Sequence, residues 1–226
     1  MRFAPVAQVD RAPASGVGCE RSSRSRGTLL LRNGRQVIDT LELIEIRWHG
    51  RGGQGAVTSS ELLAQAAIAE GKFAQGFPSF GPERRGAPVL AFNRISADRP
   101  IRNRAGIVAP DVVVVLDSSL RRVVDITSGL KEEGIVVLNS RWAFEEIKSE
   151  LGGKWRLATV DAEKIAREVL GVPIVNTAML GALLKATRVV KLESLFEPLK
   201  RRFGLLGEKN IEAMKCAFSE TVVNNV

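Results

Sequence analysis

A glycine-rich turn is the first feature of the sequence that could do chemistry. Gly50, Gly52 and Gly55 match the spacing G-x-G-x-x-G, directly after a predicted strand (43–49) and before a predicted helix (56–70). Glycines permit positive φ angles and close backbone approach, so the free amides at the helix start can receive an anion such as a pyrophosphate. The candidate binding residues of this turn are Gly50, Arg51, Gly52, Gly53, Gln54 and Gly55.

The residues that follow this turn do not determine which ligand it binds. A dinucleotide site also needs an acidic residue about 20 positions further on, at the end of the second strand, to hold a ribose hydroxyl. Gln75, Gly76 and Phe77 fill that place, and Glu70 falls at the end of the predicted helix. A conventional NAD site is therefore disfavoured. A turn without a ligand, a phosphate-bearing ligand other than NAD, and a subunit contact remain, and a free NAD-dependent Rossmann oxidoreductase stays as the alternative function.

A loop over residues 76–88 is the second unusual segment. It places two aromatic residues, one acid and two arginines among several glycines and prolines, and such loops are rarely only connectors. Arg84 or Arg85 could bind phosphate or carboxylate through a bidentate fork, and Glu83 could hold an arginine or face an interface. A surface salt bridge is the alternative. The candidate binding residues of this loop are Phe80, Gly81, Glu83, Arg84, Arg85 and Gly86.

The sequence contains no recognisable set of residues that could catalyse a reaction without a partner chain. The only histidine, His49, lies beside the glycine turn and could donate to a phosphate or act as a base, but a buried, hydrogen-bonded side chain is the favoured interpretation. Asp117 stands alone after a predicted strand and is expected to cap the next helix. Cys19 and Cys216 lie far apart, so neither a disulfide framework nor a cysteine-ligated metal site is supported. We expect no catalytic residue and no metal ligand in this chain.

Composition and charge exclude other classes. The 226 residues are 45% hydrophobic, enough for a substantial core, and no run approaches the roughly 18 apolar residues of a membrane span. The net charge is +8, but residues 1–40 contain seven arginines and three acids, which gives +4 outside the predicted fold. Without an aromatic-rich basic stripe elsewhere, nucleic-acid binding is disfavoured. The two cysteines fit a reducing, intracellular compartment.

The N-terminal segment 1–40 differs from the rest of the chain. It is rich in Arg, Ser, Gly, Pro and Ala and lacks a sustained apolar period, so we expect it to be disordered. Charge interrupts any apolar run near Val9, which argues against a secretory signal. An organelle transit peptide fits the Arg/Ser bias, and residues 4–12 resemble translation through a transfer-RNA gene, which would put the true start near Leu41 or Leu43.

Apolar runs alternating with helical patterns indicate the architecture of the remainder. Uninterrupted β-branched runs at 111–116 and 135–138 are typical of strands covered on both faces. Other expected strands are 72–75, 89–95 and 156–160, and other expected helices are 119–130, 141–151, 161–170 with Asp161 as N-cap, 176–189, 192–203 and 208–222. This alternation predicts a Rossmann-like, doubly wound α/β fold with a mainly parallel sheet, helices on both faces and a helical C-terminal third.

Four blocks of sequence carry a resemblance to a known family. Residues 44–56, which read IEIRWHGRGGQGA, resemble the opening of the gamma subunit of pyruvate and ketoisovalerate:ferredoxin oxidoreductases. Residues 80–88, 110–117 and 176–182 are similar to the family's signature loop, central strand and late helix start. The blocks occur in the family's order, so the resemblance covers a gamma domain over 41–226 and leaves out residues 1–40.

The resemblance implies the chemistry of an assembled enzyme. That enzyme oxidatively decarboxylates a 2-oxoacid, such as pyruvate or 2-oxoisovalerate, transfers the acyl group to coenzyme A, releases CO₂ and reduces ferredoxin. Thiamine diphosphate and Mg²⁺ are implied to lie between the alpha and beta subunits. Two cysteines are too few to ligate the [4Fe-4S] clusters, so these also belong to a partner subunit.

The resemblance also implies a place for this chain in that enzyme. It would be a non-catalytic member of a cytoplasmic heterotetramer with alpha, beta and delta subunits, and would bind no cofactor alone. The glycine turn and the loop over 80–86 are then assigned to coenzyme A phosphates and the subunit interface. Asn176 and Thr177 are further candidates.

Overall fold

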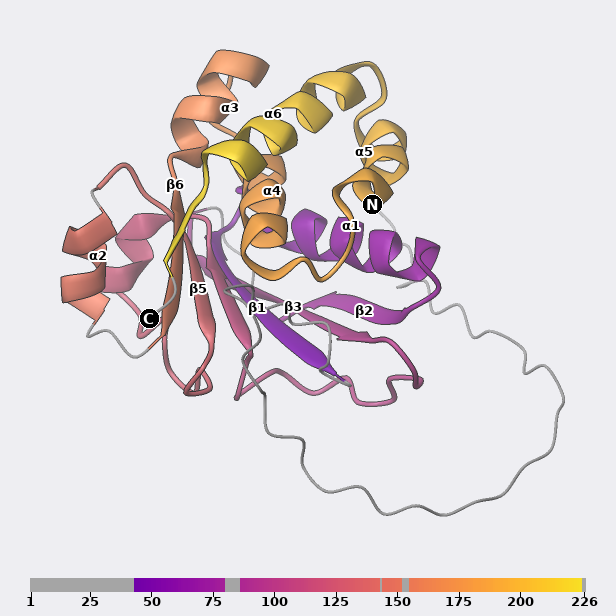
Figure 1. Cartoon of the computed structure of the whole chain (residues 1–226), viewed down its shortest axis with the longest axis horizontal. Helices are drawn as coiled ribbons and strands as arrows, with labels where there is room; N and C mark the ends of the chain where they lie inside the picture. Colours follow the sequence, from indigo (N-terminus) through magenta and orange to yellow (C-terminus); the bar gives the residue numbers. More distant parts are fainter. Residues whose placement is uncertain (1–42, 80–85, 143, 152–154, 225–226) are drawn as a thin grey trace, which may run out of the picture.

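The computed structural model describes residues 43–79, 86–142, 144–151 and 155–224 (Figure 1). In this part of the chain, one sheet of seven strands separates a thick layer of helices from a thinner one. The N-terminal extension predicted over 1–40, and with it the question of the true start, lies outside the described residues.

The sheet has a parallel centre and antiparallel edges. Its order is β2-β3-β1-β4-β5-β6-β7, in which β1, β4, β5 and β6 run parallel while β2, β3 and β7 join in antiparallel pairs. The α/β fold class is thereby confirmed, with the parallel arrangement confined to the four central strands. The strands are β1 (Ile44–Arg51), β2 (Phe73–Pro78), β3 (Pro88–Ser96), β4 (Val112–Val115), β5 (Ile135–Asn139), β6 (Arg156–Val160) and β7 (Val222–Asn224).

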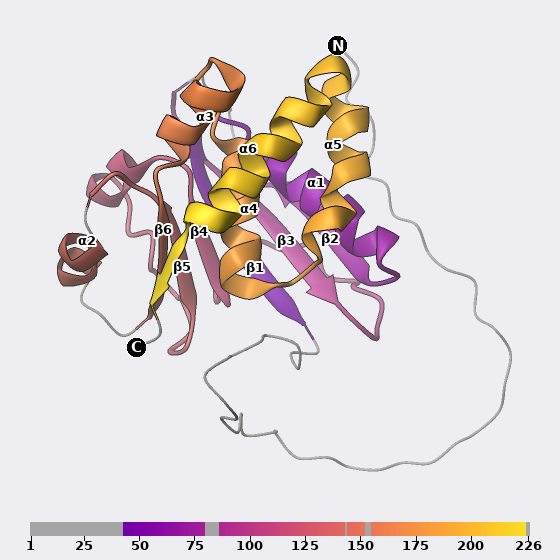
Figure 2. The ribbon, with the colours of Figure 1, turned by 45° about the horizontal axis from the view of Figure 1, so that its top comes forward.

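The two faces of the sheet are covered unequally. Most helices gather on one face, as Figures 1 and 2 show, and they include the helices of the C-terminal third. They are α1 (Ala56–Ala69), α3 (Ala162–Leu170), α4 (Asn176–Thr187), α5 (Phe196–Phe203) and α6 (Gly207–Glu220), with the short 3₁₀ helices η2 (Leu192–Leu195) and η3 (Gly204–Leu206). The other face is covered by α2 (Phe144–Leu151) and the 3₁₀ helix η1 (Ser118–Arg122).

Alternation along β1 distributes side chains between these faces. Ile46 and Trp48 are fully buried in the core beneath the large helical layer. Because successive residues of a strand point to opposite faces, Arg47 and His49 point to the other one. They pair in register with Val113 and Val115 of β4, which belong to the second core under η1 and α2. One strand thus contributes an apolar row to one layer and a polar row to the other.

Helix α4 is the centre of the large helical layer. Eleven of its twelve residues are buried, as expected for a helix that is apolar on all sides. It packs against α6 so closely that a Cβ on Gly181 would lie 2.1 Å from the carbonyl oxygen of Met214. The N-terminus of α4, at Asn176, rests against Gly55 of the glycine turn. The position of that turn therefore depends on the C-terminal third of the fold.

Several local predictions can be compared with the elements observed. Asp161 caps α3 by accepting a 2.9 Å hydrogen bond from the Lys164 backbone amide, as predicted. The helix expected over 119–130 is shortened to η1, because Asp125 and Gly129 take part in the turns that follow. The helix expected over 208–222 ends at Glu220, after which the chain turns into the unpredicted strand β7 beside β6.

Candidate functional site

The carboxyl ends of β1 and β4 bring the candidate residues together. These strands are adjacent and parallel, so the turn after β1 and Asp117 after β4 lie at the same edge of the sheet. In open α/β sheets this edge is where ligands bind. The predicted strand-to-helix turn is present, since β1 ends at Arg51 and α1 begins at Ala56.

The turn has the geometry that its glycines predict. Gly53 and Gly55 adopt positive φ angles of 96° and 85°. Gly55 is the N-cap of α1 and supplies no side-chain cap, so the first amides of the helix, which have no intrahelical acceptor, are left for a ligand or water. A Cβ on Gly55 would lie 2.9 Å from Nδ2 of Asn176, whereas a Cβ on Gly53 would have nothing within 4 Å. Gly55 is thus held by packing and Gly53 faces open space.

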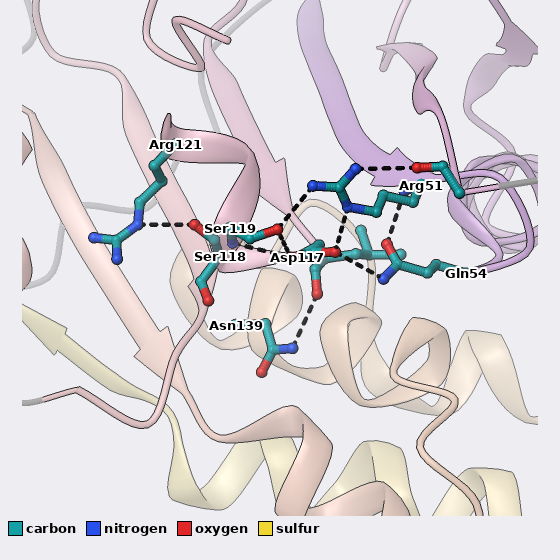
Figure 3. A network of polar contacts seen from close by, with 9 residues as sticks. Arg51, Gln54, Asp117, Ser118, Ser119, Arg121 and Asn139 are labelled. Carbon is teal, nitrogen blue, oxygen red and sulfur yellow. Dashed lines mark hydrogen bonds and ion pairs between the residues drawn. The ribbon is translucent and has the colours of Figure 1, made fainter. Parts of the chain in front are cut away.

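A polar network fixes the turn to the end of β4 (Figure 3). Arg51 Nε lies 2.8 Å from Asp117 Oδ2, and Arg51 Nη2 donates to Ser119 Oγ at 2.9 Å. Gln54 is held at both ends, because its Oε1 accepts from the Arg51 backbone amide at 2.7 Å and its Nε2 donates to Asp117 Oδ2 at 3.1 Å. The side chains of Arg51 and Gln54 therefore act first as braces of the turn.

Asp117 is the centre of this network. It caps η1, as predicted, by accepting from the Ser119 backbone amide at 2.9 Å. Partial burial raises the pKa of Asp117, but hydrogen bonds from Ser119, Gln54 and Arg51 outweigh that effect and hold the pKa below its ordinary value. The Asp117 carboxylate pairs with Arg51 at this edge, and the amides of Arg51, Gly52 and Gln54 already have partners, so the amides at the start of α1 remain as the donors of the turn.

The second candidate loop is anchored to the same turn. The Gly52 amide donates to the Ala87 carbonyl at 2.9 Å, and the Gly86 amide returns a hydrogen bond to the Gly52 carbonyl at 3.2 Å. Arg51 Nη1 also donates to the Gly86 carbonyl at 3.0 Å. The structure thus brings Gly86 to the glycine turn, while the predicted residues Phe80, Gly81, Glu83, Arg84 and Arg85 lie outside the described residues.

Asn176 and Thr177, the first two residues of α4, make different contacts. The Asn176 carbonyl accepts from Ser59 Oγ at 3.2 Å, and its side chain packs against Gly55. Thr177 is fully buried and donates to Asn210 Oδ1 at 2.7 Å, a contact between α4 and α6. Asn176 therefore belongs to the turn, and Thr177 stabilises the helical layer behind it.

Arg47 is a buried cation that sequence analysis missed. Its Nε donates to Nε2 of His49 at 3.0 Å, and its Nη2 donates to the carbonyls of Ile126 at 3.1 Å and Ser128 at 2.6 Å. The signal was the i, i+2 spacing of Arg47 and His49, which puts both on one face of a strand. The favoured interpretation of His49 is confirmed, since it is 5% exposed and hydrogen-bonded.

The environment of His49 makes its imidazole neutral. Burial, reinforced by the charge of Arg47, lowers the pKa of His49 from 6.5 to about 4, with Asp125 opposing the shift. An imidazole that accepts a hydrogen bond at Nε2 carries its proton on Nδ1. A cleft of about 440 Å³ opens over this pair, between β3 and the segment around Leu120 and Val124.

The sheet order argues against an NAD site. Strand β3 separates β2 from β1, so the end of β2 does not lie beside the glycine turn. Glu70, the only acid near the required spacing, lies at the far end of the 14-residue helix α1, about 20 Å from its start. There it accepts from the Lys191 amide at 2.6 Å and from Ser194 Oγ at 2.7 Å. Its carboxylate joins α1 to η2 and is not a ribose ligand.

Metal-binding clusters and membrane-spanning helices are both missing from the described ranges. No cluster of three His, Cys, Asp or Glu side chains there has the arrangement of a metal site. No helix in that part of the chain is both long enough and apolar enough to cross a membrane.

Comparison with known proteins agrees with this architecture. Residues 45–220 match the family model described as pyruvate ferredoxin/flavodoxin oxidoreductase. The common gamma subunit of pyruvate/ketoisovalerate oxidoreductases from Thermococcus kodakarensis is 58% identical over 183 residues, which cover 80% of this chain and 98% of that protein. Pyruvate synthase subunit PorC from Methanothermobacter thermautotrophicus is 54% identical over 179 residues, or 79% and 96% of the two chains.

A solved structure supports the same assignment. The crystal structure of the pyruvate oxidoreductase subunit PORC from Thermotoga maritima superposes with a TM-score of 0.72 at 38% identity, covering 82% of this chain and all of that one. The family model, the sequence relatives and the solved structure agree, and the family model spans the glycine turn and the helices packed around it. The chain therefore belongs to the pyruvate ferredoxin/flavodoxin oxidoreductase family, as the gamma subunit of a 2-oxoacid:ferredoxin oxidoreductase.

Proposed function

We propose that this gamma subunit lends its glycine turn to the coenzyme A phosphates at an active site whose reactive groups come from partner chains. The observation that carries the proposal is the open start of α1, where Gly53 faces free space and Gly55 supplies no side-chain cap. Oriented amides at a helix start attract an anion without any further charged side chain. The loop that contains Arg84 and Arg85, anchored at Gly86, would add cationic donors and cover the site.

The partner chains in this proposal are alpha, beta and delta subunits, in a heterotetramer located in the cytoplasm. They would hold thiamine diphosphate with Mg²⁺ and the [4Fe-4S] clusters, since the described part of this chain offers no cluster of metal-ligating side chains. The 2-oxoacid, pyruvate or 2-oxoisovalerate, would bind to the subunits that hold thiamine diphosphate. This chain would bind coenzyme A, exclude water and make no bond to the substrate, so it would be catalytically silent alone.

A charge placed at Gly53 tests the proposal. Gly53→Asp puts a carboxylate at the open start of α1, whereas Gly53→Asn adds a side chain of the same shape without charge. Both residues tolerate positive φ better than most, so the turn is preserved equally in the two variants. We expect Gly53→Asp to raise the KM for coenzyme A about tenfold over Gly53→Asn, with kcat and the KM for the 2-oxoacid nearly unchanged.

The measurement is made on the complex purified from its source through a tag on this chain. Recovery of larger subunits that contain thiamine diphosphate and iron-sulfur clusters is the first expected result, and their absence would contradict the assembly. Equal KM values for coenzyme A in the two variants would remove the turn from the coenzyme A site.

A further inference from the structure

The cleft over Arg47 and His49 has the composition of a ligand site. It lies on the face of the sheet opposite α1, and its volume of about 440 Å³ is in the usual range for small-molecule pockets. Its walls are largely apolar, with Val89 and Leu90 on one side and Leu120 and Val124 on the other. Arg47 and His49 of β1 are the polar groups between these walls.

The charge of Arg47 is not neutralised by an ion pair. The residue is only 7% exposed, and the hydrogen bonds of its guanidinium go to an imidazole and two carbonyls, all neutral. Within the described ranges no carboxylate forms a salt bridge with it. Buried arginines are almost always paired with an anion, because burying an isolated charge is costly. The site therefore has a place for an anion.

Donors remain for that anion. A guanidinium has five N–H groups, and those on Nη1 of Arg47 have no acceptor in the part of the chain that the structure describes. The same holds for Nδ1–H of neutral His49. In the described part of the chain, Gln75 Oε1 is the one side-chain nitrogen or oxygen that is buried and has no hydrogen-bond partner. Nη1 of Arg47 and Nδ1 of His49 also have no partner, so they must be accessible to solvent. Both residues line the cleft, which supplies that solvent.

One acidic residue also lines the cleft and must be considered. Asp125 is exposed, and its Oδ1 accepts from the backbone amide of Thr127 at 3.0 Å and from its hydroxyl at 2.8 Å. These bonds use only Oδ1, and Asp125 forms no salt bridge with Arg47 in the described structure, but its charge acts on both Arg47 and His49. Asp125 lowers the net potential of the cleft, which favours a singly charged ligand over a multiply charged one.

We propose that this cleft binds a small organic monocarboxylate with a short aliphatic body, received by Arg47 and by Nδ1–H of His49. The planar guanidinium fork fits a carboxylate, and a neutral imidazole adds a donor without adding charge. The apolar walls accept an aliphatic group and disfavour a hydrated inorganic ion. The proposal does not rest on the coenzyme A assignment, because its donors are Arg47 and His49, which that assignment does not use, although Gly50 of the glycine turn also lines the cleft.

The single histidine of the chain makes the cleft directly observable. The imidazole signals in the NMR spectrum of the full chain come from His49 alone. Butyrate, at pH 7, is expected to shift these signals saturably. Butyramide, which has the same shape without charge, and inorganic phosphate are expected to bind at least about tenfold more weakly. Butyrate with no saturable effect, or phosphate binding as well as butyrate, would overturn the proposal.

A pair of adjacent variants separates the cleft from general charge effects. Substitution of Arg47 would also remove its hydrogen bonds to the Ile126 and Ser128 carbonyls, so an effect on folding could not be separated from an effect on binding. Val124→Glu instead places a competing carboxylate on the cleft wall, and Val123→Glu makes the same change at a neighbouring residue that is 62% exposed. Val124→Glu should weaken butyrate binding at least about tenfold, and Val123→Glu less than about twofold. Equal effects would contradict the proposed site.

The assembled complex distinguishes a small ligand from a carboxylate of a partner subunit. Equilibrium dialysis of radiolabelled butyrate is compared between complexes that contain the Val123→Glu and Val124→Glu chains. One additional butyrate per copy of this chain in the Val123→Glu complex supports the proposal. No difference between these complexes, despite binding by the free chain, would show that a partner occupies the cleft and would overturn it.

Discussion

Two arginines on the same face of β1 have opposite electrostatic surroundings. Arg51, at the carboxyl end, is partly exposed and forms a salt bridge with Asp117 within a network of side chains. Arg47, four residues earlier on the same strand, is almost completely buried and donates only to neutral acceptors. Burial lowers the pKa of Arg47 because the charged form is poorly solvated.

The difference indicates which groups of each region are available to a ligand. At the glycine turn the charged side chains neutralise one another and fix the backbone, and the amides at the start of α1 remain as donors. At the cleft the backbone is paired within the sheet, and side-chain donors of Arg47 and His49 remain. The first region is a positioned turn, and the second is a buried guanidinium without a salt bridge in the described structure, with Asp125 as the nearby acid.

The largest expected effect comes from the turn itself. Gly55→Ala forces a left-handed conformation on a side-chain residue and brings Cβ within 2.9–3.1 Å of Asn176. These two strains should cost about 3 kcal/mol of unfolding free energy, measured by urea denaturation. Gly53→Ala, with positive φ but open space, should cost about 1 kcal/mol. Equal losses in the two variants would show that contact with Asn176 does not position the turn.

The cleft has its own signature in the pH dependence of stability. The unfolded chain protonates its histidine below pH 6.5, but the folded chain does so only near pH 4, so stability is lost as the pH falls through this window. Between pH 7 and pH 5 this loss should be about 2 kcal/mol. His49→Gln, which keeps an acceptor for Arg47, should remove it. If the unfolding free energy changed with pH by the same amount in both chains, that result would contradict a buried neutral imidazole.

The smallest effect is expected at the Asp117 network. Asp117→Ala removes the cap of η1 and leaves Arg51 without its carboxylate, which should cost about 1–2 kcal/mol in thermal or urea unfolding. Asp117→Asn keeps a capping oxygen and should lose about half as much. If Asp117→Asn were as damaging as Asp117→Ala, the charge rather than the cap would dominate at this edge.

The parts of the fold that sequence predicts well are local. The strand and helix around the glycine turn, the apolar runs of β4 and β5, and the cap at Asp161 all follow from periodicity and capping chemistry. The insertion of β3 between β2 and β1, and the pairing of β7 with β6, depend on contacts between distant segments. A three-residue strand such as β7 is too short to show a period of its own.

The candidate site divides in the same way. The glycine spacing predicted the turn, and the lone Asp117 was expected as a cap, but its bond to Arg51 joins residues 66 positions apart and has no local signal. Arg47 was overlooked because burial of a charged residue is opposite to the general tendency. Its i, i+2 relation to His49 was visible, but only the β1–β4 register shows that this face is covered.

The close contact of α4 with α6 has an evolutionary consequence. Gly181 lies within the block 176–182 that resembles the family, and any side chain there would overlap the backbone at Met214. Selection would therefore remove substitutions at this position as efficiently as at a ligand-binding residue. Retention of glycine at this position would therefore reflect the distance between two helices and would carry no information about which molecule the enzyme binds.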